Sequence, residues 1–399
     1  MKRESFGSRL GFILVSAGCA IGIGNVWKFP YICGAYGGAA FILIYLLFLI
    51  ILGIPVLVCE FAVGRGSRKS VALSFDELQS KNGKWTPLKF IGIIGCYMLM
   101  MFYTTVGGWL MYYCYKGIRG SFVNASSDNI STQFSQMLTD VPTMLFWTIL
   151  ICVIGFAVCM FGLNNGIERV TKVMMTALIL IMVVLAIRSV TMAGAGEGIR
   201  FYLIPDFHKM VESGIGNVVF AALSQAFFTL SIGIGAMLIF GSYLDQSRSL
   251  TGEAVNIMLL DTFVALTAGF IIIPACFAYG IEPGAGPSLI FITLPNIFAQ
   301  MSGGRIWAFL FFLFLTFAAL STIIAVFENL VMFNMELLGW RRKKSVLVCA
   351  ALIIILSIPC VLGFNVWSGV QLLGEGSTIM DLEDFIVSNN LLPLGSLGY

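Results

Sequence analysis

Charged residues are scarce in this sequence, and their scarcity excludes an ordinary soluble domain. Lys, Arg, Asp and Glu make up 11% of the 399 residues, whereas hydrophobic residues make up 59%. A soluble domain has about 25% charged residues. The formal net charge is only +3, so the charge balance does not favour a nucleic-acid partner.

Histidine is nearly absent, and the cysteines are not arranged for chemistry. His208 is the single histidine and lies in a polar stretch. The ten cysteines lie in or beside apolar segments without metal-type pairing, so we interpret them as small hydrophobic residues. Because no Ser/His, Cys/His, paired-Asp or metal constellation occurs within the apolar segments, we do not expect an enzyme.

The sequence is instead rich in long apolar segments. A bilayer-spanning helix needs about 20 apolar residues. The sequence contains about ten candidates, near 10–32, 38–62, 88–115, 142–162, 167–190, 214–242, 254–280, 306–337, 345–363 and 380–399. We therefore expect an all-α, polytopic protein of the cell membrane, with residues 1–399 forming one transmembrane domain in the lipid bilayer.

The positive charges predict the orientation of the chain. They gather in loops that fall on one side if each segment crosses once: Lys2, Arg3 and Arg9; Arg65, Arg68, Lys69, Lys81, Lys84 and Lys89; and Arg341, Arg342, Lys343 and Lys344. The loop after the ninth segment is acidic. Because cytoplasmic loops carry an excess of Lys and Arg, we expect a cytoplasmic amino terminus.

Glycines interrupt the first apolar segment near its middle. Gly18, Gly22 and Gly24 each cost about 1 kcal/mol relative to alanine in a helix, and Asn25 follows them. Close packing through small residues is one explanation. A local break that frees backbone groups to line a polar cavity is the other. A second glycine-broken stretch at 231–235 favours the break, because paired interrupted helices indicate the binding site of a secondary transporter.

Several motifs make a family resemblance specific. They are Arg9-Leu10-Gly11, the glycine run with Gly24-Asn25, Phe29-Pro30, Gly166-Ile167-Glu168-Arg169, the stretch 225–231 (QAFFTLS) and Phe291-Ile292-Thr293-Leu294-Pro295. The chain resembles the neurotransmitter:sodium symporter family, bacterial branch, over essentially its whole length. The resemblance implies a 5+5 inverted-repeat fold, with repeats at 10–190 and 214–399 and unwound first and sixth helices.

The resemblance also sets expectations for the less regular segments. The region 281–300 would form an external loop whose short helices cover the pathway. The chain stops at Tyr399, within the tenth segment, and about 15 residues follow Asp384, fewer than the roughly 20 needed to cross. Family members complete this helix and continue, so we expect a fold truncated in or after the tenth helix.

The resemblance implies two sodium sites. The first would use the carbonyl of Ala20 with Asn25, Thr229 and Asp261, completed by the substrate carboxylate. The second would use the carbonyls of Gly18, Ile21 and Ala318 with the hydroxyls of Ser321 and Thr322. Oxygen ligands of this kind suit a hard cation.

Glu60 lies near the inner end of the second segment. Its side chain is either a helix-end carboxylate that reaches the interface or, by resemblance, the acceptor for the unwound backbone of the sixth helix.

The resemblance implies a substrate pocket between the two interrupted helices. The expected residues are Cys19, Ala20, Gly22, Gly24, Leu99, Tyr103, Phe228, Thr229, Ser231, Ile234, Thr322 and Val326. No acidic residue stands where monoamine carriers bind a cationic amine, which favours an α-amino acid. Gly233 and Gly235 flank Ile234 and favour a large aliphatic or aromatic side chain.

Two gates follow from the same resemblance. Lys28 would pair with Asp384 on the outer side, with Gln225 nearby. Because lysine lacks the bidentate fork of arginine, this pair should be looser than usual. Arg3 and Glu336 would close the inner side, with Phe6 packing beside them.

We therefore expect a sodium-coupled symporter of a hydrophobic or aromatic L-amino acid that works by alternating access. Asp261, with Ala265 one turn later, predicts chloride independence, and proton antiport on the return step is a further hypothesis. A non-transporting amino-acid sensor or a truncated inactive carrier is the alternative. The sequence leaves the oligomeric state open.

Overall fold

The computed structural model describes residues 4–281 and 288–399, and this part of the chain is all-helical. Seven of its helices are long and apolar enough to cross a bilayer, and a bent pair makes an eighth span. The continuous spans are Ala39–Ser67, Leu88–Arg119 (α6), Val141–Met160 (α8), Leu163–Val190, Leu250–Ala278 (α14), Gly304–Leu337 (α16) and Arg342–Leu362 (α17). The expectation of a polytopic helical membrane protein is confirmed.

Two of these spans contain a π-helical turn. The Ala39–Ser67 span consists of α3 (Ala39–Phe48), η2 (Leu49–Gly53) and α4 (Ile54–Ser67). The Leu163–Val190 span consists of η3 (Leu163–Glu168) and α9 (Arg169–Val190). Such turns are uncommon and are often found at functional sites.

The first span is broken where its glycines cluster. The helix α1 (Arg9–Ala20) ends there, and the chain resumes as η1 (Gly24–Lys28) and α2 (Phe29–Ala35), bent by 55° from α1. The sequence prediction of an unwound first helix is confirmed. The bend also explains why no single continuous helix covers 10–32.

The sixth span is divided in the same way. The helix α12 (Ile215–Thr229) is followed by an unwound stretch and then by α13 (Ala236–Tyr243). Neither half is long enough to cross a bilayer alone, which takes about 20 residues. The predicted sixth segment is thus two half-helices that meet at 230–235.

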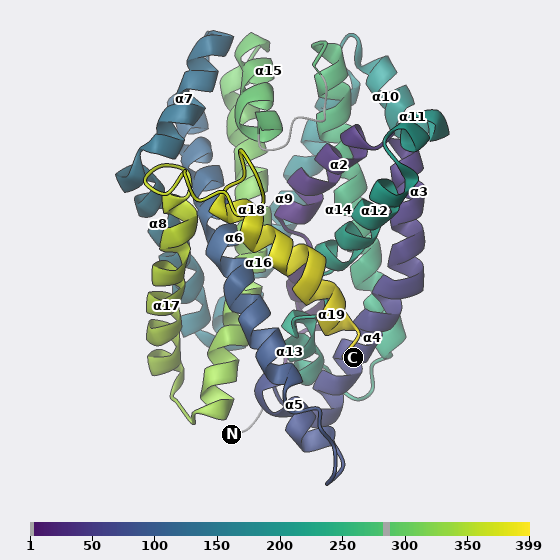
Figure 1. Cartoon of the computed structure of the whole chain (residues 1–399), viewed down its shortest axis with the longest axis vertical. Helices are drawn as coiled ribbons and strands as arrows, with labels where there is room; N and C mark the ends of the chain where they lie inside the picture. Colours follow the sequence, from purple (N-terminus) through teal and green to yellow (C-terminus); the bar gives the residue numbers. More distant parts are fainter. Residues whose placement is uncertain (1–3, 282–287) are drawn as a thin grey trace.

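The last segment is formed by α18 (Ile379–Ile386), η5 (Val387–Leu391) and α19 (Leu392–Ser396). In Figure 1 it descends obliquely across the front of α6 toward α13. It contacts α6, and η5 and α19 also contact α12. The end of the chain therefore lies against the broken sixth span.

Short helices lie at the two ends of the molecule. The N-terminus and α5 (Val71–Leu78) are at the end drawn at the bottom of Figure 1, which we call the lower end. The upper end carries α7 (Ser127–Thr139), α10 (Ala195–Leu203), α11 (Phe207–Glu212) and α15 (Leu294–Gln300), which continues from η4 (Leu289–Thr293). Short helices thus occupy the described part of the loop expected at 281–300.

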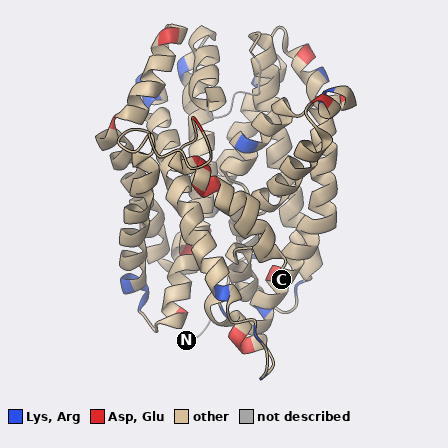
Figure 2. Ribbon diagram, in the orientation of Figure 1, with Lys and Arg blue, Asp and Glu red and all other residues tan. Residues whose placement is uncertain are grey.

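Charged residues lie mainly toward the two ends, with few between them (Figure 2). The most buried span is α16, which packs closely on α6 and also on α1, α8 and α9. This arrangement leaves the two broken spans to meet beside α16 and α6.

Candidate functional site

The break in the first span is held open by hydrogen bonds to its free amides. The amide of Gly22 donates to Oδ1 of Asn25 at 3.1 Å, and the amide of Ile23 donates to the Tyr103 hydroxyl at 2.9 Å. Gly22 has to be glycine, because a Cβ there would overlap the Tyr103 hydroxyl. The break is therefore stabilised by specific contacts with Asn25 and Tyr103, and close packing of small residues alone does not explain it.

The break in the sixth span rests on Glu60. Its carboxylate is fully buried and accepts hydrogen bonds from the amides of Gly233 at 2.5 Å and Leu238 at 3.1 Å. Ser231, Gly233 and Gly235 have positive φ angles of 52°, 95° and 72°. Backbone of this kind cannot remain in a helix, so the amides that it frees need a buried acceptor. The structure thus places Glu60 on the unwound backbone, away from the interface.

Three of the residues expected at the first sodium site lie in contact. The side-chain nitrogen Nδ2 of Asn25 donates to Oγ1 of Thr229 at 2.9 Å and to Oδ1 of Asp261 at 2.8 Å. The hydroxyl of Thr229 donates to the other carboxylate oxygen of Asp261 at 3.0 Å. All three residues are fully buried. This cluster joins the first, sixth and seventh spans, and Ala20, the fourth expected residue, is the last residue of α1.

The five residues expected at the second sodium site also converge. The Thr322 hydroxyl is 3.2 Å from the Gly18 carbonyl oxygen and 3.3 Å from that of Ile21. The Ser321 hydroxyl is 3.3 Å from the Ile21 carbonyl oxygen and 2.9 Å from that of Ala318. These five oxygens provide the donor set that a hard cation prefers.

A small cavity lies between the two breaks. Its volume is about 10 Å³, which is room for roughly one water molecule. The lining residues are Ala20, Gly22, Gly24, Leu99, Tyr103, Phe228, Ser231, Thr322 and Leu392. The first span and Tyr103 form its polar side, whereas Leu99, Phe228 and Leu392 form its apolar side.

Four residues expected in the pocket do not line this cavity. Thr229 is turned into the cluster with Asn25, and Cys19 contributes its carbonyl as the acceptor for Ser231 at 3.0 Å. Ile234 packs on the third span, where a Cβ at Gly95 would lie 2.5 Å from its Cγ2. Val326 is fully buried on α16. None of these four residues lines this cavity. Only Ile234 lies in the unwound stretch, where side-chain direction does not follow a helical register, whereas Cys19, Thr229 and Val326 lie on α1, α12 and α16.

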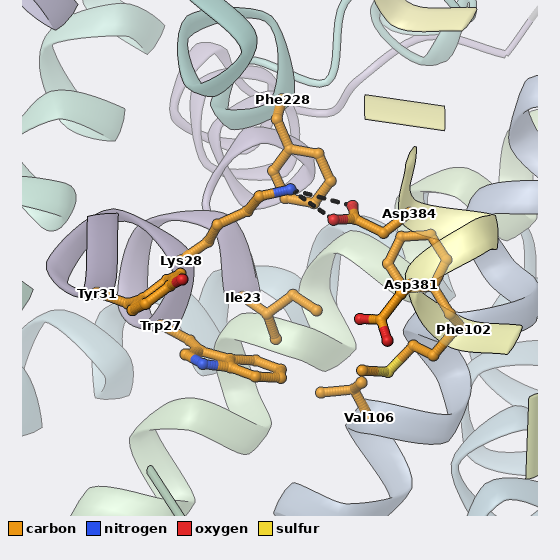
Figure 3. A pocket seen from close by; sticks show the side chains of 10 residues that line it. Ile23, Trp27, Lys28, Tyr31, Phe102, Val106, Phe228, Asp381 and Asp384 are labelled. Carbon is orange, nitrogen blue, oxygen red and sulfur yellow. Dashed lines mark hydrogen bonds and ion pairs between the residues drawn. The ribbon is translucent and has the colours of Figure 1, made fainter. Parts of the chain in front are cut away.

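A second, larger cavity of about 210 Å³ lies on the upper side of the first. Figure 3 shows its residues, with Trp27, Lys28 and Tyr31 from the first span facing Phe102 and Val106 of α6 and Asp381 and Asp384 of α18. Phe228 lines both cavities, so its ring forms part of the partition between them.

Lys28 and Asp384 form an ion pair in the upper cavity. The ammonium group of Lys28 is 2.9 Å and 3.0 Å from the two carboxylate oxygens of Asp384 and 4.5 Å from the centre of the Phe228 ring (Figure 3). The hydroxyl of Ser388 is 3.3 Å from this ammonium group and 2.5 Å from Asp384. Gln225 donates instead to the Gly24 carbonyl at 2.9 Å, so it supports the break in the first span.

The lower end holds the other expected gate residues. Glu336 accepts hydrogen bonds from the amide of Ser70 at 2.8 Å and from its hydroxyl at 2.7 Å. The expected partner, Arg3, lies outside the described residues. Phe6 packs against the rings of Phe12, Tyr243 and Phe240, with centroids 5.5 Å, 5.9 Å and 6.4 Å away.

A buried ion network at the lower end was not predicted from the sequence. Glu328, fully buried on α16, binds Arg342 at 2.8 Å and accepts a hydrogen bond from the Tyr243 hydroxyl at 3.2 Å. Arg342 also contacts Glu4 at 3.2 Å, and Glu4 accepts from the amide of Leu163 at 2.8 Å. The signal was present in the sequence, because a carboxylate within a spanning segment needs a partner.

The start of the fifth span is tied to the amino-terminal segment in a similar way. Glu168 accepts hydrogen bonds from the amide of Gly7 at 2.8 Å and from the Ser8 hydroxyl at 3.0 Å. Lys172 completes this group through contacts with both Glu168 and Ser8. Movement of α1 at the lower end would have to break these contacts.

The fold and the site together define a class of protein. A helical membrane protein in which two interrupted helices meet at a polar site beside intact spans is a secondary transporter.

Comparisons with known proteins then identify the family. Residues 3–133 and 122–374 match the sodium:neurotransmitter symporter family. An uncharacterised sodium-dependent transporter of Bacillus subtilis, YhdH, is 36% identical over 99% of this chain and 86% of its own length. A similar transporter of Haemophilus influenzae is 34% identical over 100% of this chain and 88% of its own length. The chain belongs to the sodium:neurotransmitter symporter family and is a sodium-dependent transporter, not an enzyme.

A solved structure supports the same assignment. The crystal structure of MhsT in complex with L-phenylalanine matches with a TM-score of 0.91 and 37% sequence identity. The match covers 99% of this chain and 89% of MhsT. The predicted fold class is thereby confirmed over nearly the whole chain.

Proposed function

We propose that this protein is a symporter that couples the inward movement of sodium to the uptake of a hydrophobic or aromatic L-amino acid. The observation that carries the proposal is that two buried oxygen clusters both contact the break in the first span, which also lines the cavity. One cluster contains Asn25, Thr229 and Asp261, and the other contains Ser321 and Thr322 with the carbonyls of the first break. Each cluster is the binding site of one sodium ion in this proposal.

The cavity supports an amino acid as the organic substrate. The backbone at Gly22 and Gly24, at the start of η1, faces a substrate carboxylate together with the Tyr103 hydroxyl, because an interrupted helix directs its positive end to an anion. Leu99 and Phe228 meet the side chain. MhsT, whose match covers 99% of this chain, binds L-phenylalanine.

The closed cavity implies that substrate enters by alternating access. A space of about 10 Å³ does not hold an amino acid. Entry from the upper side requires the Lys28–Asp384 pair and the Phe228 ring to move, whereas release from the lower side requires α1 to leave Glu168. In this proposal the lower end, with the amino terminus, is cytoplasmic because the positive loops lie there.

Uptake into proteoliposomes tests the proposal directly. With an inward sodium gradient, we expect the purified full chain to accumulate labelled phenylalanine, leucine or another hydrophobic amino acid, and to lose accumulation when potassium replaces sodium. The substitution Ser321→Ala, at a residue that does not line the cavity, should weaken sodium dependence without changing which amino acids compete. Binding without uptake would indicate a sensor, and sodium-independent binding would contradict both cation sites.

A further inference from the structure

The last segment of the chain contributes a wall to the proposed substrate cavity. Leu392, the first residue of α19, lines the cavity together with residues of the first-span break and is only 1% exposed. With Leu99 and Phe228 it makes up the apolar side. Leu392 lines the cavity although the sequence did not predict it, whereas Ile234, which was expected there, does not.

Leu392 is held in place by backbone contact with the unwound sixth span. A Cβ on Gly233 would overlap the carbonyl of Leu392, and a Cβ on Gly395 would overlap the carbonyl of Gly233. The two segments can approach this closely only because both positions are glycine. The Ser396 hydroxyl also donates to the Leu392 carbonyl at 2.8 Å.

The same residue, Gly233, links this contact to Glu60. The amide of Gly233 donates to Glu60, while its carbonyl faces Gly395. The position of α19 is therefore tied to the unwound stretch of the sixth span, which also lines the cavity through Ser231. A side chain fixed in this way limits the space available to a substrate, because its backbone cannot withdraw without disturbing the break.

We propose that Leu392 sets the size of the side chain that the substrate cavity accepts. The inference rests on the proposed function, since it assumes that the cavity is the amino-acid site. Shortening Leu392 makes space that a bulkier amino acid can fill, and lengthening it removes that space. One methylene group in an apolar pocket changes discrimination by about tenfold or more.

The test is thermal stabilisation of the purified full chain by each of the twenty amino acids, in sodium and in potassium. A bound ligand raises the midpoint of unfolding, so no label is needed. The first expected result is that hydrophobic amino acids stabilise the wild type in sodium and not in potassium. Its absence would overturn the proposed function, and the present inference with it.

The variants then test Leu392 alone. We expect Leu392→Ala to shift the affinity ratio of tryptophan to leucine upward by about tenfold, and Leu392→Phe to shift it downward. If Leu392→Ala fails to fold, Leu392→Val takes its place as a smaller change. It should shift the tryptophan-to-leucine affinity ratio in the same direction, upward. Leu394→Ala is the matched control, because Leu394 lies on the same helix and is 59% exposed.

An unchanged preference in all folded Leu392 variants, with sodium-dependent binding intact, would overturn the inference and leave the proposed function standing. A uniform loss of affinity for all amino acids would also overturn it, because it would show a structural role without selectivity. A shift in Leu394→Ala equal to that in Leu392→Ala would have the same consequence.

Discussion

Single buried polar residues decide whether the two breaks in this protein can exist. Glu60 satisfies two amides that no helix partner can reach, and Asn25 and Tyr103 do the same at the first break. Each of these side chains is fully or almost fully buried. Loss of one partner leaves a desolvated group behind, so changes at these positions act on stability and on binding together.

Replacement of Glu60 by glutamine should destabilise the folded protein. Only one oxygen would remain to accept from Gly233 and Leu238, and the new amide group would face a backbone donor. The expected loss is about 1–3 kcal/mol in the free energy of unfolding. Thermal unfolding in detergent measures it, with Glu77→Gln on the exposed surface of α5 as the control. Equal melting of both variants would contradict the role assigned to Glu60.

Replacement of Thr229 by valine should weaken sodium binding. The substitution keeps the shape of the side chain but removes the hydroxyl between Asn25 and Asp261. We expect sodium affinity to fall by about tenfold, which corresponds to roughly 1.4 kcal/mol. Titration of substrate binding with sodium gives this value, and Thr176→Val, at an exposed site, is the control. Sodium dependence equal to wild type would remove Thr229 from the site.

Ion pairs and hydrogen bonds join separate helices at two places, one toward each end of the molecule. At the upper side, η1 is joined to α18 by the Lys28–Asp384 pair, above the Phe228 ring of α12. At the lower side, the amino-terminal segment is joined to η3 through Glu168 and to α17 through Glu4 and Arg342. Because exposed ion pairs contribute little to stability, the half-exposed upper pair is suited to open and close.

Replacement of Lys28 by arginine should slow opening of the upper side. A guanidinium group can bind both oxygens of Asp384 in a fixed fork and can stack on Phe228. A cysteine at Val106, in the wall of the upper cavity, reports access from that side. We expect its labelling rate to fall in Lys28→Arg and to rise in Asp384→Asn. A labelling rate of this cysteine that is the same in Lys28→Arg and Asp384→Asn as without them would show that the pair does not control access.

Charge balance applies to the closed molecule as a whole. Two sodium ions and a zwitterionic amino acid would bring two net positive charges into a buried site. Asp261 is fully buried beside Asn25 and supplies one compensating negative charge, while Ala265, one turn later, has no group that could hold an anion. Transport should therefore not require chloride.

Replacement of chloride by gluconate tests this prediction in proteoliposomes. We expect wild-type uptake to be unchanged and uptake by the paired variant Asp261→Asn with Ala265→Ser to depend on chloride. Asp261→Asn alone serves as the comparison, because it removes the charge without adding a hydroxyl. A fall in wild-type uptake without chloride would contradict the role of Asp261.

Much of the architecture was determined by local sequence. Apolar length predicts the spans, and glycines at 18–24 and 231–235 predict the two breaks, because a helix in lipid has no reason to accept that cost unless its freed backbone groups are used. The sodium-type clusters were also predictable. They depend on motifs next to those breaks: Asn25 contacts Thr229, and Ser321 and Thr322 contact the Ile21 carbonyl.

Only the tertiary structure decided how the cavity is walled. Ile234 lies in an unwound stretch, where side-chain direction follows φ and ψ angles such as the 95° of Gly233 and not a helical period, so its turn onto Gly95 could not be read in advance. Leu392 is far from the breaks in sequence, and its place depends on two glycines that allow backbones from different spans to touch. Glu328 meets Arg342 for a similar reason, since their pairing depends on how α16 and α17 pack. Local patterns determine where a chain must bend, whereas the packing of distant segments determines what fills the space that the bend creates.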